Sequence, residues 1–143
     1  MKNTPTHTTR KAVALAAAAA ALALTAGAGQ ASATEALLPH PGPDGLIWIP
    51  EITGSSGFVS GGLNAHLDTF TTFACEGGGT IEVTFHLYNQ PTRDPAPFTL
   101  TCPTGTPSTI TVPLGTGLSG SFGAEVTASS PSTRWGAVVV QPE

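Results

Sequence analysis

Residues 75–102, CEGGGTIEVTFHLYNQPTRDPAPFTLTC, hold both cysteines of the chain and its clearest strand pattern. From Thr80 to Tyr88, apolar and polar residues alternate without interruption. The apolar set is Ile81, Val83, Phe85 and Leu87. A period of two is typical of a strand that buries one face and exposes the other. The stretch therefore predicts a β-strand between two cysteines.

The first 33 residues have the composition of a secretory signal. Basic residues precede an apolar run at 12–26, and Ala31-Ser32-Ala33 has the small-x-small form of a cleavage site. The run of 15 residues is shorter than the roughly 20 that span a bilayer. We expect cleavage before Thr34, a secreted extracellular protein, and no membrane insertion after cleavage.

The chain after position 33 is acidic. Its 110 residues hold all nine acidic side chains, no lysine, and only Arg93 and Arg134 as cations, which gives a net charge of −7. Such a surface repels polyanions, so we exclude nucleic acid as a partner. The length suits one domain with a modest core.

The two cysteines of an exported chain are most simply a disulfide, because that compartment is oxidising. A Cys75–Cys102 bridge closes a loop of 28 residues, for which chain entropy gives about 3.5 kcal/mol of stabilisation. A thiolate metal site or a redox-active pair requires closer spacing or further ligands, which the sequence lacks.

The segment at 34–45 is rich in proline and glycine, and it predicts an extended or loosely ordered lead-in to a domain at 46–143. Residues 46–49 form a short apolar strand pattern that ends at Pro50, which indicates an edge or a bulge. The glycines and serines of 54–62 predict a loop. Residues 63–75 read as one long strand, and 76–79 as a hairpin turn.

Further alternating segments follow at 98–102, 109–114, 121–128 and 134–141, and no window has a helical period. Six or seven short strands with regular turn signals predict an all-β, two-sheet antiparallel β-sandwich of immunoglobulin-like type. If the strands ending at Cys75 and Cys102 flanked the Thr80 strand in one sheet, they would lie about 9.6 Å apart. A disulfide tolerates roughly 4.4 to 6.8 Å between Cα atoms. The bridge therefore joins directly paired strands or crosses between the sheets. We favour the crossing, with Trp135 near it.

Two segments carry a resemblance. The first is Cys-x-Gly-Gly-Gly-x-Ile-x-Val from Cys75 to Val83, and the second is Arg-Trp-Gly-x-Val-x-Val from Arg134 to Val140. With the signal and the second cysteine, they resemble small secreted single-disulfide β-sandwich proteins of actinobacteria, over roughly residues 70–141. The resemblance implies a fold and an exported location, and no activity.

Catalytic signatures are absent. The sequence has no Gly-x-Ser-x-Gly elbow, no phosphate-binding glycine loop with lysine and no His-Glu-x-x-His motif. Nothing singles out a catalytic pair among the nine acids. We therefore expect no enzyme, no cofactor and no metal site.

One constellation is a candidate binding patch. If the turn at 76–79 closed a hairpin, His86 would lie opposite Phe70, and Tyr88 opposite Asp68, with His66 close by. Aromatic rings flanked by polar groups stack on sugar rings or anchor a protein partner. Ordinary cross-strand packing explains the same pattern without a ligand. A metal bound by two histidines and the aspartate is a further alternative.

Three functions remain open. The first is a secreted, non-enzymatic binding or structural module for an unknown protein or glycan. The second is an inhibitor of an extracellular enzyme, with Arg93 at the tip of the loop at 89–97. The third is a small carboxylate-dependent hydrolase. Arg134 is expected to cover the rim of the core with its aliphatic stem. The sequence gives no oligomeric state.

Overall fold

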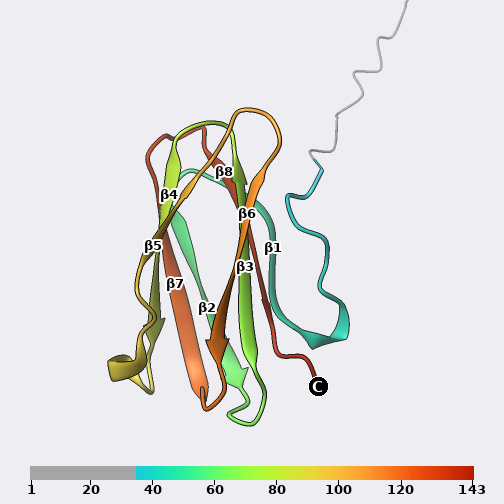
Figure 1. The fold of residues 1–143 in the computed structure, drawn as a ribbon, viewed down its shortest axis with the longest axis vertical. Helices are drawn as coiled ribbons and strands as arrows, with labels where there is room; N and C mark the ends of the chain where they lie inside the picture. Colours follow the sequence, from blue (N-terminus) through green and yellow to red (C-terminus); the bar gives the residue numbers. More distant parts are fainter. Residues whose placement is uncertain (1–34) are drawn as a thin grey trace, which may run out of the picture. The chain divides into compact units, whose positions relative to one another are not determined.

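Eight strands build two four-stranded antiparallel sheets that face each other across one core (Figure 1). The computed structural model describes residues 35–143, so the predicted signal at 1–33 lies outside the described residues. Sheet A has the order β1-β8-β3-β6, and sheet B the order β2-β7-β4-β5. The all-β, two-sheet prediction is confirmed.

The elements follow one another with short connections. The strands are β1 (Gly45–Thr53), β2 (Ser56–Leu63), β3 (Thr69–Glu76), β4 (Thr80–Leu87), β5 (Phe98–Thr101), β6 (Ser108–Gly115), β7 (Gly120–Ala128) and β8 (Arg134–Val140). Two short 3-10 helices, η1 (Gly42–Asp44) and η2 (Pro91–Arg93), precede β1 and β5. In this part of the chain no helix is long and apolar enough to cross a membrane.

The strand order is that of one long antiparallel hairpin rolled into a sandwich. β1 pairs with β8, β2 with β7, β3 with β6, and β4 with β5. Rolling adds the pairs β3·β8 and β4·β7. Eight strands wound in this way form a jelly roll. An immunoglobulin sandwich pairs its first strand with its second, so the expected immunoglobulin-like order is not the one observed.

The core lies between the sheets, and the β4 alternation supplies one side of it. Ile81, Val83 and Phe85 are at most 1% exposed. From sheet A, Phe73 meets Phe85 edge to face at 6.1 Å between ring centroids. Trp135 is fully buried beside them. The predicted inward face of the Thr80 strand is therefore confirmed.

The disulfide joins the two sheets. Cys75 lies in β3 of sheet A, and Cys102 directly follows β5 of sheet B. Their Cα atoms are 5.0 Å apart, and both residues are buried. The predicted cross-sheet bridge is confirmed. Cys75 is also the ladder partner of Trp135.

The turn after β3 was predicted wrongly as a hairpin turn. Gly77, Gly78 and Gly79 all have positive φ, between 80° and 93°, which glycine adopts without strain. They carry the chain from sheet A to sheet B, because β3 already has β6 and β8 at its two sides. The Gly77 N–H donates to Pro103 O, and the Cys102 N–H to Gly79 O. No pairing of Phe70 with His86 therefore exists.

The Gly/Ser-rich stretch predicted as a loop is strand β2. Phe58 directs its ring inward, 6.2 Å from Phe73 and 6.0 Å from Phe122 between centroids. This packing outweighs the low strand propensity of the glycines. The long strand expected at 63–75 is also wrong, because β2 ends at Leu63 and β3 starts at Thr69.

The predictions for the chain before β2 had mixed outcomes. β1 is an edge strand with a register shift between Ile49 and Ile52, as Pro50 indicated. The lead-in, by contrast, is packed. Leu38 is 7% exposed and contacts Ala74 and Val138 on the outer face of sheet A. The expectation that the lead-in does not pack is therefore wrong, because Leu38 covers apolar side chains that would otherwise face water.

Candidate functional site

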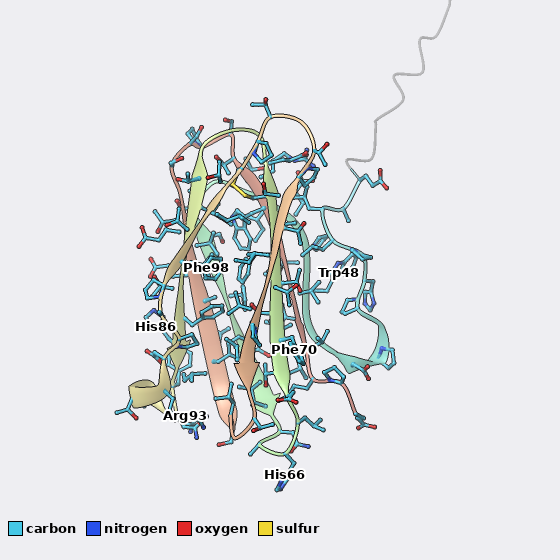
Figure 2. All side chains as sticks on the ribbon, viewed as in Figure 1. Trp48, His66, Phe70, His86, Arg93 and Phe98 are labelled. Carbon is cyan, nitrogen blue, oxygen red and sulfur yellow. A yellow bond between two sulfur atoms is a disulfide. The ribbon has the colours of Figure 1, made fainter. Side chains whose placement is uncertain are left out.

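The structure separates the five residues of the predicted patch. His86 lies in β4, and Tyr88 directly follows it, both exposed on the outer side of sheet B. Phe70 lies in β3 of sheet A and is half-buried, while His66 and Asp68 belong to the loop between β2 and β3. Figure 2 places His86 on the sheet B side of the sandwich and His66 at one end.

The metal alternative loses its geometric basis with this separation. Within residues 35–143 no three histidine, cysteine or acidic side chains are grouped so as to hold a metal ion. His86 instead lies beside Asp94, with 3.8 Å between Nδ1 and the nearer carboxylate oxygen. Asp94 also accepts the Leu87 N–H at 2.7 Å, so it fastens the loop after β4 to the end of that strand.

The ring of Tyr88 leans across β7. A Cβ built on Gly123 would stand 2.9 Å from the Tyr88 hydroxyl oxygen and 3.4 Å from its Cε2. Gly123 faces outward and is nevertheless buried, because the ring covers it. Tyr88 itself remains 57% exposed. Because Gly123 has no side chain, the Tyr88 ring can lie directly against the backbone of β7.

Val59 lies on the other side of Gly123, as its ladder partner in β2. It is 65% exposed, the most open large apolar side chain among the described residues. Tyr88, Val59 and His86 line one shallow hollow of about 600 Å³. We call this the Tyr88 surface; its remaining lining comes from Ser55, Ser56, Gly57, Phe58, Ala124, Glu125, Val126 and Thr127.

The Tyr88 surface is acidic. Glu125 is exposed at its floor, where it is the register partner of Thr84 on one side and Gly57 on the other. No ion pair to Glu125 is formed within residues 35–143. The two arginines of that range lie elsewhere, in η2 and in β8 of sheet A. The surface therefore combines an aromatic ring, a valine and an uncompensated carboxylate.

Arg93 does not project from the tip of its loop. Its guanidinium donates to the carbonyls of Gly117 and Thr116 at 2.9 and 3.1 Å. Gln90 Nε2 also donates to Gly117 O, and Asn89 Oδ1 accepts the Ser121 N–H. These hydrogen bonds fasten the loop to the β6–β7 connection. The guanidinium of Arg93 is therefore already hydrogen-bonded within the chain.

Arg134 is held between two carboxylates at the outer side of sheet A. Its Nε donates to Glu51 at 2.8 Å, and its two terminal nitrogens reach Glu51 and Glu76. The hydrogen bonds from Arg134 lower the pKa of Glu51, and burial opposes them. The same bonds raise the pKa of Arg134. This triad fastens β1, β8 and β3 to one another.

Sequence reasoning found Tyr88 and His86 and missed their neighbours. The sequence predicts a loop at Val59, and it predicts only an alternating strand at 121–128, which holds Gly123 and Glu125. The available signal was the pair Phe58-Val59 inside a Gly/Ser run. Both residue types favour strands, and successive strand side chains point to opposite faces, which places one ring inward and the valine outward.

Fold and surface together define a disulfide-bridged, eight-stranded β-sandwich with one exposed aromatic surface on sheet B. Comparison with protein-family models, with curated proteins and with solved structures finds no match. Neither a relative nor the fold therefore assigns a function to this chain.

Proposed function

We propose that the chain is an exported, non-enzymatic binding module that contacts a partner protein outside the cell through the Tyr88 surface. Export is supported by the signal pattern at 1–33 and by the resemblance to small secreted actinobacterial sandwiches. The partner is a protein because the surface combines apolar contact area with an unpaired carboxylate, which together suit a mixed apolar and basic protein surface.

One observation carries this proposal. Of the three exposed large apolar side chains in residues 35–143, Trp48 donates its Nε1–H to Leu38 O and stacks edge-on against His40. The other two, Tyr88 and Val59, flank Gly123 on one face. A tyrosine held in one orientation offers a large contact area with little loss of side-chain freedom on binding.

The two other functions have less support. An inhibitor that inserts Arg93 into an enzyme cleft would first have to break the hydrogen bonds to Thr116 and Gly117. A carboxylate hydrolase gains rate from a site that excludes water, whereas the hollow over Glu125 is shallow and open. Binding by a preformed surface requires neither change.

The test compares Tyr88→Ala with Thr99→Ala, a matched control on β5 of the same sheet. Immobilised mature protein is exposed to proteins from the medium of the producing culture, and separately to cellulose, chitin and xylan. Captured proteins are identified, purified and titrated back. We expect Tyr88→Ala to weaken the affinity at least tenfold, as for a central aromatic contact, with an unchanged melting temperature.

The outcomes are distinguishable. A purified partner whose affinity does not depend on Tyr88 overturns the assignment of the surface. Tyr88-dependent binding to a neutral polysaccharide, with no protein partner, keeps the surface and replaces the partner class. If Tyr88→Ala unfolds the domain, the ring is part of the fold, and the assignment of the binding surface is overturned.

A further inference from the structure

We infer that the free edge of β2 accepts an extended segment of the partner protein as a fifth strand of sheet B, with a lysine or arginine of that segment reaching Glu125. This deepens the proposed function and rests on it, since the edge of β2 borders the Tyr88 surface. Strand addition draws affinity from main-chain hydrogen bonds and specificity from alternate side chains.

Three of the four sheet edges are protected and β2 is not. β1 contains Pro50, whose carbonyl accepts the Leu37 N–H of the lead-in. β5 has four residues and lies between Pro97 and Pro103, and β6 contains Pro113. Proteins blunt their edges with prolines, charges and short strands. β2 has eight residues without proline or charge, and its pairing with β7 is regular from Ser56 to Ser60, with a register shift only between Ser60 and Leu63.

The backbone groups on the open side of β2 can be assigned from the ladder. Tyr88 N–H donates to Ser121 O, and in an antiparallel pair bonded and non-bonded positions alternate. The odd residues of β7 therefore bond to β4, and the even residues, such as Ala124, bond to β2. Phe58 is the partner of Ala124. Gly57 and Val59, which lie in the regular part of this ladder, consequently turn their N–H and C=O groups away from β7.

Within residues 35–143, no hydrogen bond outside the β2–β7 ladder uses the N–H or C=O of Gly57 or Val59. Unpaired backbone groups along a strand are a template for another strand. An added segment would satisfy the alternate groups that β7 leaves free.

The outer face beside this edge is open because Gly57 has no side chain. Gly57 is the register partner of Glu125, so no β2 side chain at that position separates the edge from the carboxylate. Strands are spaced about 4.8 Å apart. A lysine or arginine opposite Gly57 can therefore extend across one strand spacing to Glu125, and an apolar neighbour two residues away would meet Val59.

Charge favours a different protein over a second copy of this chain as the occupant of the β2 edge. The only cations among residues 35–143, other than histidine, are Arg93 and Arg134, and both are hydrogen-bonded within their own chain. A second copy would supply no cation for Glu125, and the net charge of −7 after position 33 repels it. A basic extended segment is complementary to the site.

The experiment titrates the mature protein with the blocked peptide Thr-Val-Thr-Lys-Thr-Val-Thr and measures amide hydrogen exchange residue by residue. We expect the peptide to slow exchange at Gly57 and Val59 at least tenfold, whereas Phe58 and Ser60 are protected in the free protein by the ladder. A matched peptide with glutamate in place of lysine should bind more weakly, and raised salt should reduce this difference.

Two variants and one modified peptide supply the controls. Glu125→Gln should weaken the lysine peptide about two- to fivefold, the range of an exposed ion pair, and leave a serine-substituted peptide unchanged. Val59→Pro removes an outward N–H without a ladder bond and should abolish binding, while Val59→Thr should retain it. If Val59→Pro does not fold, a peptide N-methylated at alternate residues tests the same hydrogen bonds on the native protein.

Each contrary outcome is specific. Peptide binding that depends on Tyr88 without slowed exchange at Gly57 and Val59 overturns strand addition and leaves the proposed function standing. Slow exchange at these amides in the free protein, together with a dimer mass in solution, assigns the edge to a second copy. No response to the lysine peptide, in a protein that captures its partner through Tyr88, also overturns the inference.

Discussion

Cys75 and Trp135 lie opposite each other in the β3–β8 ladder, and both are fully buried. The disulfide to Cys102 therefore connects the sheets in the same layer of the core as its largest side chain. The Trp135 Nε1–H donates to Gly54 O at 2.8 Å, which adds the connection between β1 and β2 to this layer. The disulfide and the Trp135 hydrogen bond thus connect β3, β8, the end of β5 and the β1–β2 connection at one end of the sandwich.

Removing the bridge should lower the stability of the domain substantially. For the double variant Cys75→Ala/Cys102→Ala we expect a loss of about 3.5 kcal/mol, because the unfolded chain regains the freedom of a 28-residue loop. Urea unfolding of both proteins, followed by tryptophan fluorescence, measures this. An unchanged midpoint would mean that the core alone sets the stability.

The sequence was sufficient to predict two packed β-sheets, but it was not sufficient to predict the order of the strands within them. A disulfide that crosses the sheets requires that the chain change sheets between Cys75 and Cys102. Two connections lie in that interval, the glycine turn at 76–79 and the loop at 89–97. Either can cross, and glycine at three positions suits a hairpin and a crossing alike. The choice follows from which neighbours flank β3, and those come from distant β6 and β8.

The candidate site was predictable only in part for the same reason. Alternation in β4 placed His86 and Tyr88 outward, and this is a local property. Which residues lie beside them depends on β7 and β2, whose Gly123 and Val59 lie 35 and 29 residues from Tyr88 along the chain. Without the register of these strands, Val59 and Glu125 could not be predicted to lie near Tyr88. Phe70 was placed wrongly in the Tyr88 patch because a β3–β4 hairpin was assumed.

The Arg134 triad should make stability depend on acid. The folded state lowers the pKa of Glu51 below its ordinary 4.5, so the unfolded chain takes up the proton first as the pH falls. The contribution of the pair is therefore complete above about pH 5 and is lost as the pH falls through the lowered pKa. Arg134→Met should reduce stability by about 1 kcal/mol at pH 7, and the difference from the native chain should shrink below pH 4. An equal difference at both pH values would contradict the role of Glu51, and Glu51→Gln is the matched variant.

The processing prediction concerns residues outside the described range. We expect the exported protein to begin at or within a few residues of Thr34, because Ala31-Ser32-Ala33 has the form of a signal-peptidase site. Intact mass spectrometry of the protein from culture medium measures its N-terminus. Secreted protein that still carries Met1 to Ala33 would show that the segment is not a cleaved signal.

The contact of the Tyr88 ring with β7 can be tested by adding one methyl group beneath the ring. In Gly123→Ala the new Cβ would lie 2.9 Å from both the Tyr88 hydroxyl oxygen and Phe58 O, so the ring must move and β2 must shift slightly. We expect about 1 kcal/mol of destabilisation, as is usual when a well-packed site is overfilled, and a changed environment of the tyrosine in near-ultraviolet circular dichroism. Gly61→Ala is the matched control, since its Cβ would meet only Ser121 Oγ at 3.7 Å. A Gly123→Ala protein with the stability and tyrosine signal of Gly61→Ala would show that the ring does not rest on β7 in solution. Partner affinity should fall in Gly123→Ala and persist in Gly61→Ala, because only the first displaces the ring.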